Sequence, residues 1–131
     1  MTGIAKGKFG VKLAPLAFED VPAESLLGRL SLDKTFEGDL VGTSRGQMLT
    51  AGDNRSGSGV YVAVERVTGT LNGKSGTFAL HHTGIMDQGQ PSLEIRVVPG
   101  SGTGELAGIS GALTIEIKDK VHYYTLEYAL A

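Results

Sequence analysis

The chain has 131 residues, a length that fits one domain over residues 1–131 and that buries a core without disulfides or metals. Hydrophobic residues make up 40%, charged residues 20%, and the formal net charge is -2, which argues against disorder and against a nucleic-acid partner. Cysteine is absent, which excludes disulfides, thiolate catalysis and thiolate metal sites, and the 20 glycines indicate many turns and bends.

Eight segments alternate between apolar and polar residues, the period of two that predicts half-buried strands. The second segment has a helical alternative, because Pro22 opens a short stretch of helix formers, but Gly28 and the sustained alternation favour a strand. The predicted strands are residues 4–18, 26–36, 40–51, 60–71, 77–82, 93–97, 113–117 and 122–130.

Turn-forming residues separate the predicted strands. Short clusters of Gly, Asn and Asp predict tight turns at 37–39, at Asn72-Gly73 and at Asp119-Lys120. Longer polar stretches predict loops at 52–59 and 83–91.

A glycine-rich joint, residues 98–111, connects the sixth strand to the seventh. Glycine tolerates positive φ and close backbone approach, so this segment can bend sharply against neighbouring chain. Eight strands with almost no helix bury their apolar faces in a sandwich or a closed barrel, and only the barrel leaves no unpaired edge. We therefore expect an all-β fold, an eight-stranded antiparallel barrel with little or no helix, closed by this joint.

Three segments carry a resemblance to a known family. Residues 73–84 (GKSGTFALHHTG), 97–111 (VVPGSGTGELAGISG) and 122–128 (HYYTLEY) resemble the bacterial domain of unknown function 3224 family, and the match is best over residues 60–131. That family is similar in fold to allene oxide cyclase, an eight-stranded antiparallel barrel, and dirigent proteins share the glycine-rich joint. The resemblance implies a barrel whose lumen holds an apolar molecule, and it implies no catalytic residue.

Two short motifs match enzyme signatures outside the required structural context. Gly102-Thr-Gly-Glu-Leu-Ala107 has the dinucleotide-binding pattern, but that motif opens a helix, and here strand alternation soon resumes. Gly42-Thr-Ser44-Arg-Gly46 has the serine-hydrolase pattern, but nothing nearby predicts the strand-to-helix elbow that exposes the nucleophile. Neither motif indicates a function.

Histidines are the residues best suited to chemistry. His81 and His82 are neighbours on a strand and point to opposite faces, so we expect only His82 to face the interior, near the end of its strand. His122 shares a face with the tyrosines of the last strand. Such a pair can shuttle a proton, polarise a carbonyl or bind a metal, and the simpler interpretation is two hydrogen-bonded residues at strand ends. No third metal ligand is evident, so we expect neither a metal nor another cofactor.

The residues predicted to bind a ligand share the inner face of the fifth and eighth strands. They are Phe78, Leu80, His82, His122, Tyr124 and Tyr128. The two tyrosines also fit a core role with satisfied hydroxyls.

Several charged residues fall on the parity opposite to the apolar one. We expect them on a solvated outer face, in cross-strand ion pairs, with an inverted barrel as the alternative, in which this polar set lines the lumen. They are Glu65, Glu94, Arg96, Glu116 and Glu127. Tyr61 and Tyr123 share the outer parity and are expected to mark a subunit interface, so we expect a homo-oligomer.

Three functions remain open. The first is binding of an apolar or amphipathic small molecule in the lumen. The second is a cofactor-free isomerase or cyclase in the same cavity, with His82 or His122 as acid or base and Tyr124 as hydrogen-bond donor. The third is a non-catalytic structural or interaction protein with a packed interior. Whether the protein is an enzyme stays open. No segment predicts a signal peptide or membrane span, so we expect a cytoplasmic protein without a membrane partner.

Overall fold

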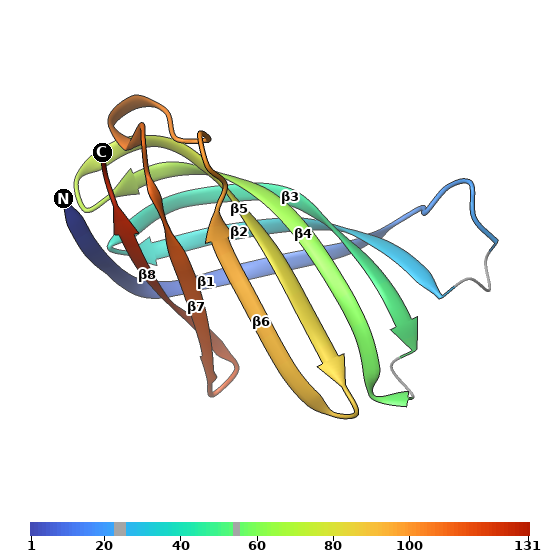
Figure 1. Ribbon diagram of the computed structural model, residues 1–131. Coiled ribbons are helices and arrows are strands. Elements are labelled where there is room, and N and C mark those ends of the chain that lie inside the picture. Colours follow the sequence, from blue (N-terminus) through green and yellow to red (C-terminus); the bar gives the residue numbers. More distant parts are fainter. Residues whose placement is uncertain (23–25, 54–55) are drawn as a thin grey trace.

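The eight predicted strands form a closed antiparallel barrel in the computed structural model, which describes residues 1–22, 26–53 and 56–131 (Figure 1). Each strand pairs with the next along the chain, and β1 pairs with β8, so the barrel is confirmed over the sandwich. The strands are β1 (Thr2–Leu16), β2 (Leu27–Gly38), β3 (Leu40–Asp53), β4 (Ser58–Leu71), β5 (Lys74–Asp87), β6 (Gln90–Val97), β7 (Ser110–Lys118) and β8 (Val121–Ala129). In the described part of the chain, no helix has the length and apolar character needed to cross a membrane.

The tight turns are confirmed, but the predicted loop at 83–91 is wrong. Asn72 and Gly73 both have positive φ, as do Asp119 and Lys120, which suits two-residue hairpins. β5 continues to Asp87 and β6 begins at Gln90, so a third two-residue turn replaces the loop. The tip of this hairpin is exposed, and β5 and β6 pair as far as Asp87 with Gln90. His82 therefore lies in the middle of its strand and not near its end.

Two other predictions include residues 23–25 or 54–55. The predicted loop at 52–59 is shortened from both sides, because β3 runs to Asp53 and β4 begins at Ser58, while residues 54–55 lie outside the described residues. The helical alternative after Pro22 falls on residues 23–25, which also lie outside them.

One end of the barrel is packed with apolar side chains. Phe36, Leu40, Leu71 and Phe78 are buried there. Both chain termini lie at this end of the barrel (Figure 1). The glycine-rich joint crosses this end through a single turn of 3-10 helix, η3 (Gly104–Leu106), and buries Leu106 and Ile109 in the same core. The joint also extends the edge of β5: the Thr103 N–H donates to the Thr77 carbonyl at 2.8 Å, and a Cβ at position 76 would overlap the Thr103 carbonyl oxygen.

At the opposite end the strands flare apart (Figure 1). β6 pairs with β7 at only two positions, Ile95 with Leu113 and Arg96 with Ala112, and β1 pairs with β8 only as far as Phe9. Apolar side chains that point inward at this end, such as Leu13 and Leu93, are consequently exposed. The lumen is therefore packed at one end and open at the other.

The inward face of β4 is the reverse of the expected one. Val60, Val62 and Val64 point outward and are exposed, whereas Tyr61 and Glu65 point inward. The expectations that Glu65 lies on the solvated outer face and that Tyr61 marks a subunit interface are both wrong. Valine favours strands whichever face it occupies, so the valine run did not identify the inner face. The inverted barrel is wrong as well, because the packed interior is apolar.

The other charged residues named above are exposed on the outer wall, as expected. Their ion pairs run within a strand: Glu94 with Arg96, and Glu116 with Lys118. Cross-strand pairs do occur elsewhere on this wall, between Lys8 and Glu37 and between Asp33 and Arg45. Tyr123 is exposed outside the barrel, in agreement with its parity.

Candidate functional site

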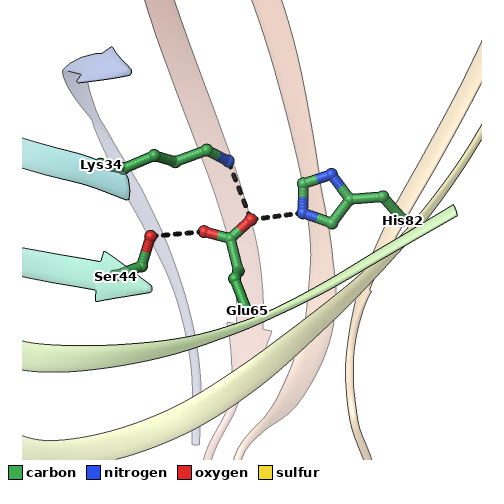
Figure 2. A network of polar contacts seen from close by, with 4 residues as sticks. All are labelled: Lys34, Ser44, Glu65 and His82. Atoms are coloured by element: carbon green, nitrogen blue, oxygen red, sulfur yellow. Dashed lines mark hydrogen bonds and ion pairs between the residues drawn. The ribbon is translucent and has the colours of Figure 1, made fainter. Parts of the chain in front are cut away.

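Four polar side chains meet inside the barrel, between its packed end and its open end (Figure 2). Lys34 comes from β2, Ser44 from β3, Glu65 from β4 and His82 from β5, so neighbouring strands contribute one residue each. Lys34 lies opposite Ser44 in the β2–β3 register, which brings their inward side chains together. All four side chains are buried, and we call them the polar cluster.

Glu65 is the centre of the polar cluster. Its Oε2 accepts a hydrogen bond from Lys34 Nζ at 2.9 Å, and its Oε1 accepts one from Ser44 Oγ at 2.7 Å. His82 Nε2 lies 2.5 Å from Oε2, and no described residue gives this nitrogen an aligned hydrogen bond. Because a carboxylate only accepts, the hydrogen of the imidazole must be on Nε2, whatever its charge. Nδ1 is the nitrogen left for another partner.

The carboxylate of Glu65 is ionised despite its burial. Burial alone raises the pKa of this carboxyl, but the close imidazole of His82, the charge and hydrogen bond of Lys34 and the hydroxyl of Ser44 lower its pKa from 4.5 to about 2. Lys34 Nζ also lies 4.8 Å from the centroid of the Phe9 ring and 5.9 Å from that of Phe36, where the ring faces stabilise a cation. The lysine and the glutamate thus form a buried pair of opposite charges.

An apolar hollow of about 760 Å³ opens towards solvent at the flared end. We call it the mouth. Its wall is formed mainly by β3 to β6, with Leu30 of β2. The side chains that shape it include Leu30, Met48, Tyr61, Met86, Pro91 and Leu93.

Tyr61 lies between the mouth and the polar cluster. It lines the mouth, and its ring centroid is 6.4 Å from that of His82. The ring rests against the β5 backbone at Gly84, where a Cβ would overlap the ring carbons. The Tyr61 hydroxyl makes no hydrogen bond with a described residue. Burial, and then the charge of Glu65, raise the pKa of Tyr61, so the hydroxyl keeps its hydrogen and can donate it.

Small residues separate the polar cluster from the mouth. The next inward positions towards the open end are Gly46 on β3, Ala63 on β4 and Gly84 on β5. Beyond Ala63, the next inward residue on β4 is Tyr61, which lines the mouth. The polar cluster therefore lies deeper in the barrel than the mouth, and none of its four residues lines the mouth.

The six predicted ligand-binding residues occupy two different environments. Four are buried in the packed end: Phe78, Leu80, Tyr124 and Tyr128. His82 belongs to the polar cluster, whereas His122 packs on the Phe9 ring at 5.2 Å between centroids. None of the six lines the mouth.

The hydroxyls of the two core tyrosines are satisfied by neighbouring chain, as their parity suggested. The Tyr124 hydroxyl accepts the Leu40 N–H at 2.9 Å and donates to the Glu37 carbonyl at 3.0 Å. The Tyr128 hydroxyl accepts a hydrogen bond from the Asn72 amide at 2.8 Å.

Sequence reasoning missed three of the four residues of the polar cluster. A signal existed for Lys34, a lone charge between Leu32 and Phe36 on the apolar parity of its strand. The valines on the opposite parity of β4 indicated the wrong inner face, so Glu65 was assigned to the outer wall. Ser44 had been considered only as a hydrolase nucleophile, and it lies mid-strand on β3, hydrogen-bonded to Glu65. Among the described residues, no three His, Asp or Glu side chains are grouped as metal ligands.

Comparison with known proteins identifies a family and no function. The family model that matches is described as a protein of unknown function (DUF3224), and it covers residues 5–128. A crystal structure of a DUF3224 family protein of unknown function from Shewanella oneidensis MR-1 is 42% identical, with a TM-score of 0.92 over 100% of this chain and 98% of that chain. No curated protein matches the chain.

Proposed function

The chain belongs to the DUF3224 family, and on that premise we propose that it binds an apolar or amphipathic small molecule in the mouth of its barrel. The half-packed lumen is the observation that supports this function. Inward apolar side chains at the open end, Met86 and Leu93 among them, are left exposed by the described residues. A ligand that covers them gains roughly 25 cal/mol per Å² of apolar surface removed from water.

The dimensions and polarity of the mouth suit such a ligand. Its volume of about 760 Å³ falls within the range of small-molecule sites, which are mostly apolar with a few polar groups. Tyr61, whose hydroxyl makes no hydrogen bond with a described residue, lines the mouth together with Thr50, Ser58 and Ser92. We infer a ligand with an apolar body and one hydrogen-bonding oxygen. The likeness to allene oxide cyclase stays a prediction.

Titration with Nile red, a neutral apolar dye, tests the proposal. We expect saturable binding that weakens by roughly tenfold or more in Leu93→Lys, because the lysine puts a charge on an apolar wall. Val41→Lys is the matched control, since Val41 is exposed on the outer wall (58%, against 47% for Leu93), and it should bind the dye like the wild type.

Native mass spectrometry of freshly purified protein complements the titration. A small-molecule adduct that is lost on denaturation would identify the natural occupant. Equal dye binding by Leu93→Lys and the wild type would overturn the proposal, as would a protein that binds no dye.

A further inference from the structure

We propose that Arg45 and Arg66, on the outer wall of the barrel, bind the phosphate group of a phosphate monoester. The mouth and the polar cluster lie on the inner face of the same strands, so this site goes beyond the proposed function. The two sites can therefore be tested separately.

The two arginines are neighbours of like charge. Arg45 of β3 lies directly opposite Arg66 of β4 in the register of the two strands, and both residues are exposed. Like charges directly opposite each other on neighbouring strands destabilise a sheet. Both side chains point away from the core, so burial does not compensate for the repulsion. An anion held between the two arginines would remove it.

The protein satisfies few of the donors of the two guanidinium groups. Arg45 forms one ion pair, in which its Nε lies 3.2 Å from Asp33 Oδ1. Arg66 forms no ion pair with a described residue, and its one hydrogen bond is a long one, from Nη2 to Thr77 Oγ1 at 3.4 Å. Each guanidinium has five N–H donors, so most of the donors at this pair remain for a ligand.

A shallow hollow of about 550 Å³ lies at the pair, and both arginines line it. Gln47 of β3 also lines it. The Gln47 Oε1 accepts a hydrogen bond from Arg29 Nε at 2.9 Å, so its amide N–H groups are left as further donors. Ser101 of the glycine-rich joint lines the hollow too, but its hydroxyl already accepts the Ala79 N–H and donates to the Val98 carbonyl. The available polar groups of the hollow are therefore donors.

This donor set suits a phosphate group better than a carboxylate. A guanidinium donates two parallel hydrogen bonds to a pair of oxygens, and a carboxylate has only two oxygens, which one arginine occupies. A phosphate monoester has three acceptor oxygens and carries close to two negative charges at neutral pH, so it can serve both arginines. The hollow is larger than a phosphate group. The body of the ester would lie against Val64 and Ala79, which also line the hollow.

Titration with phenyl phosphate, followed by ¹⁵N–¹H NMR at constant ionic strength, tests the site. We expect saturable shifts of the amide signals of Arg45, Gln47 and Arg66. The affinity should fall by roughly tenfold or more in Arg66→Gln, because the charged fork is lost. Arg96→Gln is the matched control. It removes the same charge from the outer wall, where Arg96 is exposed and pairs with Glu94, and it should bind like the wild type.

Thermal unfolding gives a second readout that also shows whether the variant folds. Without ligand, Arg66→Gln should have a Tm no lower than that of the wild type, because the substitution removes the repulsion between like charges. Phenyl phosphate should raise the Tm of the wild type and leave that of Arg66→Gln unchanged.

A second arm distinguishes a soluble ester from a lipid headgroup with the same chemistry. Vesicles of phosphatidylcholine and phosphatidic acid in equal parts present phosphate monoesters on a surface, and vesicles of phosphatidylcholine alone are the control. We expect binding of phenyl phosphate without sedimentation of the protein with either vesicle. Sedimentation with phosphatidic acid that is lost in Arg66→Gln would support the same site and identify its source as a lipid.

Three results would overturn the site. They are the absence of Arg66-dependent binding in both arms, an equal loss of affinity in Arg96→Gln, and binding of benzoate as tight as that of phenyl phosphate. Nile red should bind Arg66→Gln as it binds the wild type, because the mouth is on the other face of the strands. Loss of the phosphate site with normal dye binding would leave the proposed function standing.

Discussion

Lys34 Nζ lies 2.9 Å from Glu65 Oε2, and the two side chains are only 5% and 0% exposed. Breaking such a pair leaves one charge buried without its partner, which costs about 3–5 kcal/mol. We therefore expect Lys34→Met to lower the free energy of unfolding by about that amount in a urea titration.

Two comparison variants separate charge from packing. Lys34→Met/Glu65→Leu leaves no buried charge and should regain most of the lost stability. Asp33→Asn removes the exposed pair with Arg45, whose closest N–O distance is 3.2 Å, and should change the stability by less than about 1 kcal/mol. The prediction is wrong if Lys34→Met is as stable as the wild type.

The depressed pKa of Glu65 predicts a specific loss of stability in acid. The folded protein holds this carboxylate with a pKa of about 2, against an ordinary value of 4.5, so the unfolded chain takes up the proton first as the pH falls. The stabilisation is complete above pH 4.5 and is lost between pH 4.5 and about 2. It amounts to about 3 kcal/mol at 1.36 kcal/mol per pKa unit.

Urea titrations at several pH values in that window test this expectation. Glu65→Gln should show a flatter fall in stability with decreasing pH than the wild type. Ser44→Ala removes one of the hydrogen bonds to the carboxylate and should give an intermediate slope. Identical slopes for Glu65→Gln and the wild type would contradict the prediction.

The close approach of Tyr61 to the backbone of β5 depends on Gly84. A Cβ at position 84 would overlap the ring, so Gly84→Ala should displace Tyr61 and cost about 1–3 kcal/mol. Tyr61→Leu should reduce that cost, and a double-mutant cycle measured by urea unfolding would give a coupling of about 0.5–3 kcal/mol. Gly10→Ala is the control, since a Cβ there meets nothing within 4 Å. Additive effects of the two substitutions would contradict the predicted contact.

The outer wall of β3 and β4 predicts self-association. Leu49 of β3 and Val60, Val62 and Val64 of β4 are exposed on this wall, and Leu49 lies opposite Val62 in the register of the two strands. The homo-oligomer expected from the sequence stays a prediction, now assigned to this surface instead of Tyr61. Light scattering at micromolar concentration should give a multiple of the 13.7 kDa chain mass, and Val62→Lys should lower it. A wild-type mass of one chain would contradict the prediction.

The architecture could be predicted from local patterns, because each of them acts over a few residues. Alternation identified all eight strands, and Asn72-Gly73 identified a hairpin. The loop predicted at 83–91 was wrong because polar residues also occur in strands whose hydrogen bonds come from the neighbouring strand. The polar residues after His82 therefore gave no sign that β5 continues to Asp87.

The sequence by itself determined the strands, their turns and the closed barrel, since these follow from side-chain period and turn chemistry. Only the tertiary structure decided which face of β4 is inside, and with it the whole polar cluster. Alternation shows which residues share a face and not which face is buried. Glu65 is stable inside only because Lys34 and Ser44, 31 and 21 residues away, arrive from other strands with its countercharge and a hydrogen bond. Where the lumen is packed and where it opens was likewise decided by the pairing of distant strands.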